Sequence, residues 1–280
     1  MTPGAAAGHV GSGLPVGDLL DTATVTVDLP VPASALAIGA HPDDIEFGAG
    51  ATLARWARAG CRVRHLVLTD GSKGSWDPDE DLGALVASRM EECRAAAARL
   101  DGVPIDELPA DRVQFLGRVD GELVDDAATR REVARVIRTE RPEVLFGHDP
   151  WRRYQLHPDH RAAGFLMLDA LVAARDPHFF GDLGLDPHRP GAVLLWEADV
   201  ANHVERADGL EGVKVDALLC HHSQLETTMG MDPTAGPGHD VPTADGGRAG
   251  FAERIGWQLA QHGALVGYGA GEAFHLMTGV

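Results

Sequence analysis

The sequence predicts an α/β fold, a Rossmann-like three-layer sandwich with a mostly parallel sheet. Short apolar runs alternate with longer stretches of helical periodicity along most of the chain. The first apolar run, residues 33–40, lies between Pro32 and Pro42 and suits a strand that is buried on both faces. A buried strand, a helix and a second buried strand in succession indicate a right-handed crossover between parallel strands.

The elements follow one another in this alternation. After the strand at 33–40, residues 48–60 place Leu53, Trp56 and Ala57 at helical spacing. Residues 63–68 form a second apolar strand, and a long helix that is Ala-rich at its end follows at 82–100. The same order continues with strands at 112–116, 144–147 and 192–196 and helices at 126–140 and 158–174.

The domain organisation is predicted to be simple. We expect an N-terminal extension at 1–30 and a single domain at 31–280. A Gly- and Pro-rich insertion at about 229–250 indicates either a disordered surface segment or a mobile lid. Residues 71–81, rich in Gly, Ser and Asp, follow the second strand, where open α/β sheets place ligand-binding loops.

The composition limits the possible partners. There are 24 Lys and Arg against 42 Asp and Glu, a formal charge of −18, which argues against binding to nucleic acid or to an anionic membrane. No run of about 18 apolar residues suggests a membrane span. The N-terminus lacks a basic start followed by an apolar run, so no secretory signal is expected. Cys61, Cys93 and Cys220 form no C-x-x-C pair, which favours a reducing, cytoplasmic location.

Two histidine motifs carry the expected chemistry. His41-Pro-Asp-Asp44 follows the first buried strand, and His157-Pro-Asp-His160 starts a helix after a later strand. The carboxyl ends of parallel strands meet at one edge of a sheet, so both motifs can converge there. Imidazole and carboxylate suit Zn²⁺, although Fe²⁺ or another divalent ion is also possible with these donors. No Gly-x-Gly-x-x-Gly follows the first strand, which disfavours a nucleotide-binding module.

With these motifs the sequence resembles the PIG-L or LmbE-like family of zinc-dependent N-acetylglucosaminyl deacetylases. Other family-like pieces are Thr69-Asp-Gly71, Arg89-Met-Glu-Glu92, Phe115-Leu-Gly117, Asp120-Gly121, His222-Ser-Gln224 and Glu272-Ala-Phe274. The resemblance implies an LmbE-like fold and a hydrolase that removes an N-acyl group, acetyl foremost, from an amino sugar or related glycoside. The resemblance extends from about Ala33 to Phe274, which is most of the chain.

The resemblance also implies residue roles. His41, Asp44 and His160 would bind zinc. Asp43 would be the general base that activates the attacking water, and His157 would stabilise the oxyanion of the tetrahedral intermediate. Asp159 would orient a histidine or cap its helix.

Further residues are weaker candidates. Arg89 could contact the sugar or form a surface salt bridge, and Lys73 could contact substrate from the loop at 71–81. Tyr154 could reach the scissile carbonyl or pack at the rim. His148 and Asp149 could support the metal ligands, whereas packing is favoured over a second metal for residues 220–222.

Several alternatives remain. An amidase of thiol–sugar conjugates of the mycothiol type would use the same metal chemistry on a bulkier acyl group. A catalytically inactive sugar-binding relative would keep the fold alone. No serine or cysteine nucleophile with a matching turn is evident, which argues against a covalent acyl intermediate. The expected partner is a small amino-sugar substrate, a homo-oligomer is possible, and the Ala- and Gly-rich composition is typical of a high-GC bacterium.

Overall fold

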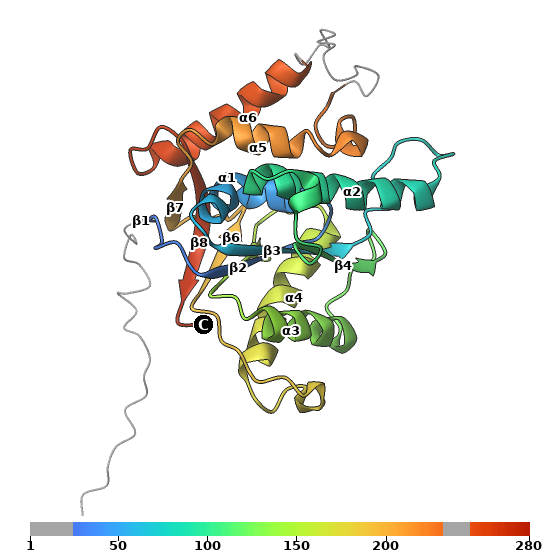
Figure 1. Cartoon of the computed structure of the whole chain (residues 1–280), viewed down its shortest axis with the longest axis vertical. Coiled ribbons are helices and arrows are strands. Elements are labelled where there is room, and N and C mark those ends of the chain that lie inside the picture. Colours follow the sequence, from blue (N-terminus) through green and yellow to red (C-terminus); the bar gives the residue numbers. More distant parts are fainter. Residues whose placement is uncertain (1–24, 232–246) are drawn as a thin grey trace, which may run out of the picture.

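An eight-stranded sheet forms the centre of the structure, a computed structural model that describes residues 25–231 and 247–280 (Figure 1). Most of the predicted insertion at 229–250 and most of the predicted extension at 1–30 lie outside these ranges. The strand order is β1-β7-β8-β6-β5-β2-β3-β4. Neighbouring strands are parallel except at β8, which is antiparallel to both β6 and β7. The strands are β1 (Thr26–Val27), β2 (Ser34–Gly39), β3 (Arg62–Thr69), β4 (Val113–Arg118), β5 (Val144–His148), β6 (Ala192–Trp196), β7 (His203–Arg206) and β8 (Gly271–Thr278).

Helices cover both faces of the sheet, which confirms the predicted three-layer α/β fold. In Figure 1 one layer lies above the sheet and the other below it. The upper layer holds α1 (Asp44–Arg58), α2 (Leu82–Asp101), α5 (Glu211–Leu218) and α6 (Gly247–Ala264), and the lower layer holds α3 (Ala127–Glu140) and α4 (Pro158–Arg175).

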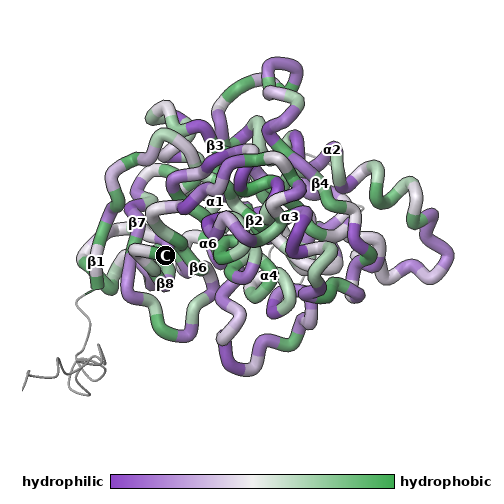
Figure 2. Tube along the Cα trace, turned by 90° about the horizontal axis from the view of Figure 1, so that it is seen from below, coloured by the Kyte–Doolittle hydropathy of each residue, from purple (hydrophilic) through white to green (hydrophobic). Residues whose placement is uncertain are grey.

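Two apolar layers hold the helices against the sheet. Strand β2 is buried along its whole length; its Ala35 and Ala37 pack with the upper helices, and its Leu36 and Ile38 pack with the lower ones. Figure 2 shows apolar segments gathered around the central strands. Burial on both faces explains why the first strand is a continuous apolar run.

The direction in which the chain adds strands reverses next to β2. From β2 the chain passes to β3 and β4 on one side, and it then returns to place β5 on the other side of β2. In parallel α/β sheets, such a reversal leaves a crevice at the carboxyl ends of the two strands. The loops that follow β2 and β5 carry the two histidine motifs, so the topology brings them together.

Helix α1 is broken near its start. Ala49 has non-helical dihedral angles (φ −144°, ψ 18°), so the first turn, which carries Asp44, is separate from the longer second part. The predicted helix at 48–60 misses the first turn, whose Asp44, Glu46 and Gly48 interrupt the apolar helical pattern. The Cβ of an alanine at position 48 would lie 2.3 Å from the Trp196 ring, so only glycine fits against that indole.

None of the helices within the described ranges combines the length and apolar character needed to cross a bilayer.

Candidate active site

The turn after β2 places three polar side chains in a buried position. His41, Asp43 and Asp44 are each less than a tenth exposed. The His41 amide donates to Asp44 Oδ2 over 2.6 Å, which closes the turn. Asp43 has φ 106°, in the left-handed region that residues other than glycine, asparagine and aspartate rarely adopt. The two adjacent carboxylates have different neighbours, because Asp44 contacts His148 and His160 whereas the charges near Asp43 include Arg89.

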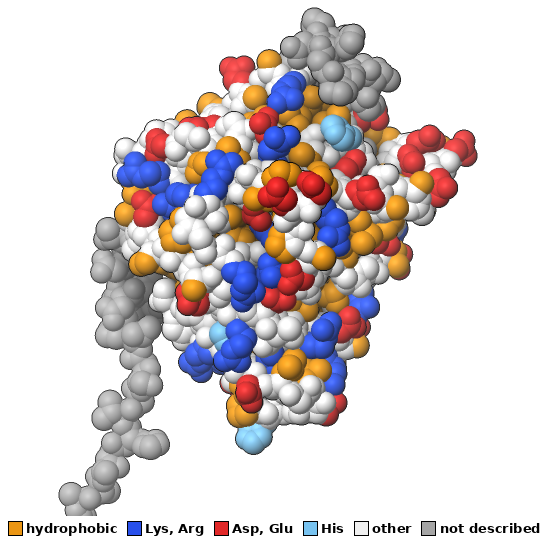
Figure 3. All heavy atoms as spheres, in the orientation of Figure 1, with side chains coloured by type: hydrophobic (Ala, Val, Ile, Leu, Met, Phe, Trp, Pro, Cys, Tyr) orange, Lys and Arg blue, Asp and Glu red, His pale blue; other side chains and the backbone are white. Residues whose placement is uncertain are grey.

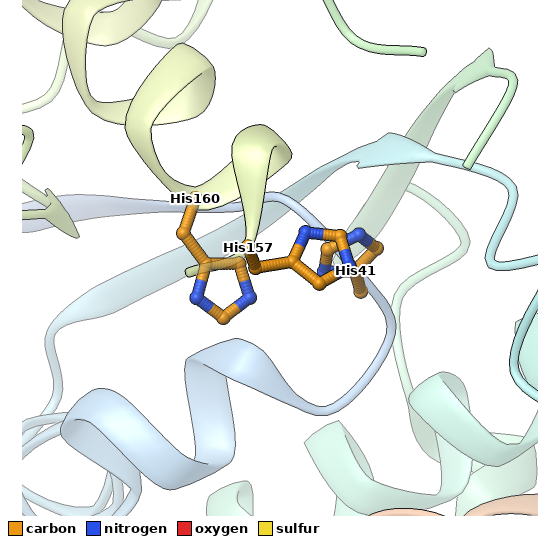
Figure 4. Close-up of side chains that lie close together, drawn as sticks. All are labelled: His41, His157 and His160. Carbon is orange, nitrogen blue, oxygen red and sulfur yellow. The ribbon is translucent and has the colours of Figure 1, made fainter. Parts of the chain in front are cut away.

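The second motif lies at the start of α4. Pro158 occupies the first turn, where its missing N–H costs no helical hydrogen bond. The Asp159 amide donates to His157 Nδ1 over 3.3 Å, so His157 caps the helix. A neutral His157 then carries its proton on Nε2. Figure 4 shows the rings of His41, His157 and His160 gathered together, with centroids 4.4 to 5.2 Å apart.

Asp159 and Asp120 fix the orientation of His41. The Nε2 atom of His41 lies 3.1 Å from Asp159 Oδ2 and 3.2 Å from Asp120 Oδ1. Both partners are acceptors, so Nε2 carries a proton and donates it. The other ring nitrogen, Nδ1, faces Asp44 Oδ2 at 3.4 Å. Burial lowers the pKa of His41, but hydrogen bonds to Asp120, Asp159 and Asp44 outweigh it and raise this pKa to about 12, so a metal ion at Nδ1 would replace a proton there. The expected orienting role of Asp159 agrees with these contacts.

Asp44 lies between two histidines of the motifs. His41 Nδ1 approaches one of its oxygens, and His160 Nε2 lies 3.3 Å from the other, Oδ1. The second ring nitrogen of His160 faces Gln155 Nε2 at 3.3 Å and Glu197 Oε2 at 3.9 Å. His41 Nδ1 and His160 Nε2, from two distant segments, therefore both lie next to the Asp44 carboxylate. Among the described residues, the groups of side chains that could hold a metal ion include one that joins His41 and His160 with His157, and one that joins Asp44 and His160 with His148.

His148 lies beside these residues and contacts Trp196 and Asp44. Trp196 Nε1 donates to His148 Nδ1 over 3.1 Å, and His148 Nε2 lies 3.2 Å from Asp44 Oδ2. An indole N–H can only donate, so Nδ1 accepts in this contact. Nε2 also lies 3.4 Å from the Ala40 amide nitrogen, and His148 forms one group of possible metal ligands with Asp44 and His160.

Comparison with known proteins decides the family. The model of the GlcNAc-PI de-N-acetylase family, PIG-L, matches residues 36–171, which include both motifs. The diacetylchitobiose deacetylase of Thermococcus kodakarensis is 38% identical over 194 residues, which cover 68% of this chain and 69% of that protein. This chain belongs to the PIG-L family.

Other relatives agree with this assignment. A 1D-myo-inositol 2-acetamido-2-deoxy-alpha-D-glucopyranoside deacetylase of Streptomyces griseus is 33% identical, over 77% of this chain and 66% of that protein. The structure of the N,N'-diacetylchitobiose deacetylase of Pyrococcus horikoshii, solved with an inhibitor, superposes with a TM-score of 0.74 at 26% identity. It covers 89% of this chain and 85% of that one. As a PIG-L member the chain is a hydrolytic enzyme of the N-deacetylase class.

In this PIG-L chain the two motifs border a cavity of about 550 Å³. It is lined by side chains from several elements, including residues that the sequence motifs do not identify as site residues. These are Phe47, Trp76, Asp120, Trp196, Glu197, Gln224, Thr227, Thr228 and Gln258. Glu197 directly follows β6, and its place after an apolar strand is the one signal in the sequence that could have indicated it.

Asp43 is fully enclosed at the base of the cavity. Burial and the neighbouring Asp44 carboxylate raise the pKa of Asp43 to about 6, and the positive charge of Arg89 opposes this shift. A carboxylate with a pKa near the working pH can accept a proton from water and later return it.

Arg89 connects the turn after β2 with the loop after β3. It is buried, and its guanidinium donates to the backbone oxygens of Gly71 and Pro42. A Cβ at position 71 or 74 would lie within 2.5 Å of the Arg89 Nη1 atom, so glycines are required where this loop wraps the guanidinium. Arg89 lines the cavity and forms none of the surface salt bridges that the sequence left possible.

The other predicted residues lie farther from the motifs. Lys73 lines the cavity at its rim, where its ammonium pairs with Glu122 over 3.0 Å. Tyr154 is 93% exposed and is absent from the cavity lining. His221 is buried with Nε2 3.4 Å from Glu46 Oε2, and the groups of possible metal ligands found in the described ranges do not include residues 220–222. Asp149 is also buried and accepts from the Trp151 amide over 2.9 Å, which shapes the loop before the second motif.

Proposed function

We propose that this chain is a zinc-dependent N-deacetylase of an amino sugar or a related glycoside. The observation that carries the proposal is the convergence of His41 Nδ1, the Asp44 carboxylate and His160 Nε2 beside the buried carboxylate of Asp43. The relatives named above act on N-acetylated sugars, according to their names, and support the same class of substrate.

The donor set fits a catalytic zinc ion. Two imidazoles and one carboxylate are a three-ligand set that leaves a position open. A zinc-bound histidine donates its other ring N–H to an acceptor, and Asp159 and Asp120 are such acceptors for His41 Nε2. A carboxylate oxygen of Glu197 lies 3.9 Å from His160 Nδ1. When bound there, the ion would polarise the amide carbonyl and make a water molecule more acidic.

Asp43 is the proposed general base. It is adjacent in sequence to the proposed ligand Asp44, and it lines the same cavity. In this position Asp43 accepts the proton of the attacking water and passes it to the departing amine.

His157 is the proposed oxyanion donor. Its Nδ1 is occupied by the Asp159 amide, so the neutral ring donates from Nε2. Burial and the nearby His41 and His160 lower the pKa of His157, which keeps the ring neutral. A fixed donor aimed at developing negative charge stabilises the transition state more than the ground state.

Arg89 and Lys73 are the proposed substrate contacts. Both line the cavity, and Arg89 presents a charged group whose position is fixed by backbone bonds on two loops. Tyr154 would contact substrate only after movement of the loop at 151–156, because its side chain lies in solvent. We also propose a cytoplasmic location, on the cysteine content of the sequence.

Hydrolysis of thiol–sugar amides of the mycothiol type is the second candidate, because it needs the same ligands and base. A sugar-binding protein without activity is the third. One experiment separates them: the zinc-loaded protein is incubated with N,N'-diacetylchitobiose, an N-acetylglucosaminyl inositol and a cysteinyl-amide glycoside. Release of acetate from either acetylated sugar, lost on chelation and restored by Zn²⁺, supports the proposal. Cleavage of the cysteinyl amide alone would favour the amidase, and binding without cleavage would refute an enzyme.

A further inference from the structure

The indole of Trp76 lies at the mouth of the active-site cavity and is 73% exposed. It belongs to the loop between β3 and α2, which projects at the right of Figure 1 and carries acidic side chains at its tip in Figure 3. Trp76 takes part in none of the ring–ring or cation–π pairs of the described residues, whereas the exposed Trp151 packs edge-on against Phe165. Its apolar face is therefore available to a ligand.

The backbone around Trp76 is nevertheless held in place. The Gly74 carbonyl accepts from Gln224 Nε2 over 3.2 Å and from Thr227 Oγ1 over 3.3 Å. On the adjoining residue, Ser75 Oγ donates to Glu80 Oε2 over 3.1 Å. An aromatic side chain on a backbone that is already ordered loses little entropy when it binds a ligand.

A second cavity of about 470 Å³ lies on the other side of Trp76. The two cavities share Trp76 and Thr227, so the indole forms part of the wall of both. Cavities of this size hold small ligands. A substrate whose acetamido group is at the metal ligands can therefore extend across the indole into the second cavity.

The second cavity selects against anions. Carboxylates of Asp77, Glu80, Glu92 and Glu226 line it, and no lysine or arginine does so in the described part of the chain. Carboxylates accept hydrogen bonds from hydroxyl and ammonium groups, and they repel phosphates and other carboxylates. The C–H face of a pyranose ring is apolar and can pack on an indole.

We propose that Trp76 forms a subsite for a second sugar ring, neutral or carrying an amine, attached to the ring that is deacetylated. This inference rests on the proposed N-deacetylase function and deepens it. The substrate is then an amino-sugar disaccharide or longer glycoside, and the Trp76 ring stacks on its second ring.

The test compares N,N'-diacetylchitobiose with N-acetylglucosamine. Trp76→Ala should lower the ratio of the two kcat/KM values, disaccharide over monosaccharide, by about tenfold, mainly through the KM for the disaccharide. Trp76→Phe, which keeps an aromatic face, should restore most of the ratio. Trp257→Ala is the matched control, because Trp257 is 66% exposed and lines neither of these two cavities.

An unchanged ratio in Trp76→Ala would overturn the inference. If the wild-type protein hydrolyses neither sugar, the proposed function fails, and the subsite is then tested by calorimetry. Binding of the disaccharide that is tighter than that of the monosaccharide and is weakened by Trp76→Ala would still support the subsite. Equal binding by the two proteins would refute it.

Discussion

The ammonium group of Lys214 and the carboxylate of Glu272 lie 2.6 Å apart inside the break of helix α1. Lys214 Nζ also donates to the Phe47 carbonyl over 2.7 Å, at the end of the first turn. Glu272 accepts hydrogen bonds from the backbone amides of Ala51 and Thr52, which lie in the first turn of the second part of α1. Lys214 from α5 and Glu272 from β8 therefore bond the backbone groups on both sides of the break in α1. These bonds fix the turn that carries Asp44.

Removal of one member of this pair should destabilise the protein strongly. Lys214→Met leaves the Glu272 charge buried without a partner, so we expect the free energy of unfolding to fall by about 3–5 kcal/mol. Urea denaturation measures the change. Arg248→Met, which breaks an exposed pair with Asp216, is the control and should cost less than about 1 kcal/mol. A loss in Lys214→Met no larger than in this control would contradict the role of the pair.

Asp43→Asn should abolish most of the turnover while zinc remains bound. Asparagine tolerates the positive φ of this position, which alanine does not, so the turn should keep its shape. The loss of a general base should lower kcat about 10²- to 10⁴-fold. Steady-state kinetics and zinc content are measured on the same preparation. Near-normal kcat would show that another group is the base.

His160→Ala and His157→Ala should differ in their zinc content. His160 is a proposed ligand, so its removal should leave less than one zinc ion per chain after dialysis. His157 is a proposed oxyanion donor, so its removal should keep the zinc and lower kcat about 10²- to 10³-fold. Elemental analysis and kcat are compared for the two variants. If His157→Ala lost the zinc and His160→Ala kept it, His157 would be the ligand and His160 the oxyanion donor.

His148→Phe should weaken zinc binding without removing a ligand. The variant loses the ring nitrogen that lies 3.2 Å from Asp44 Oδ2, and loss of such a supporting partner commonly costs 10- to 100-fold in metal affinity. Competition with a chromophoric chelator measures the affinity. Trp196→Phe, which removes the donor to His148, should show a smaller effect in the same direction. An unaltered zinc affinity in both variants would show that His148 does not support Asp44 as a ligand.

Most strands and helices from 33 to 196 could be predicted because they are buried on both faces or have long helical periodicity, and the partly exposed β4 could be predicted from its short apolar run. Strand β7 could not, since two of its four residues, Glu205 and Arg206, are charged. In β8, Glu272 and His275 interrupt the apolar pattern, because Glu272 is needed at the break in α1. The contact that explains β8 is with a helix more than 200 positions away, which no local pattern reveals.

The proposed zinc ligands and base could be assigned because they lie in two short motifs. Asp120 and Glu197 could not be given a role in this way, since neither belongs to the two histidine motifs and each joins the site only through the sheet. Their contacts, with His41 and with the ring nitrogen of His160, depend on the strand order β6-β5-β2-β3-β4. The proposed zinc ligands can therefore be read from the motifs, whereas the residues that contact them are known only from the folded structure.

The reversal of strand order beside β2 also affects how the protein resists unfolding. His41 and its partner Asp159 are 118 positions apart, and the expected ligands come from the same two segments. An ion held there would connect the early and late parts of the sheet. The unfolded chain has no preformed site for the ion, so binding favours the folded state. The melting temperature should consequently rise with free Zn²⁺, by the equivalent of about 2.7 kcal/mol at a hundredfold excess over Kd.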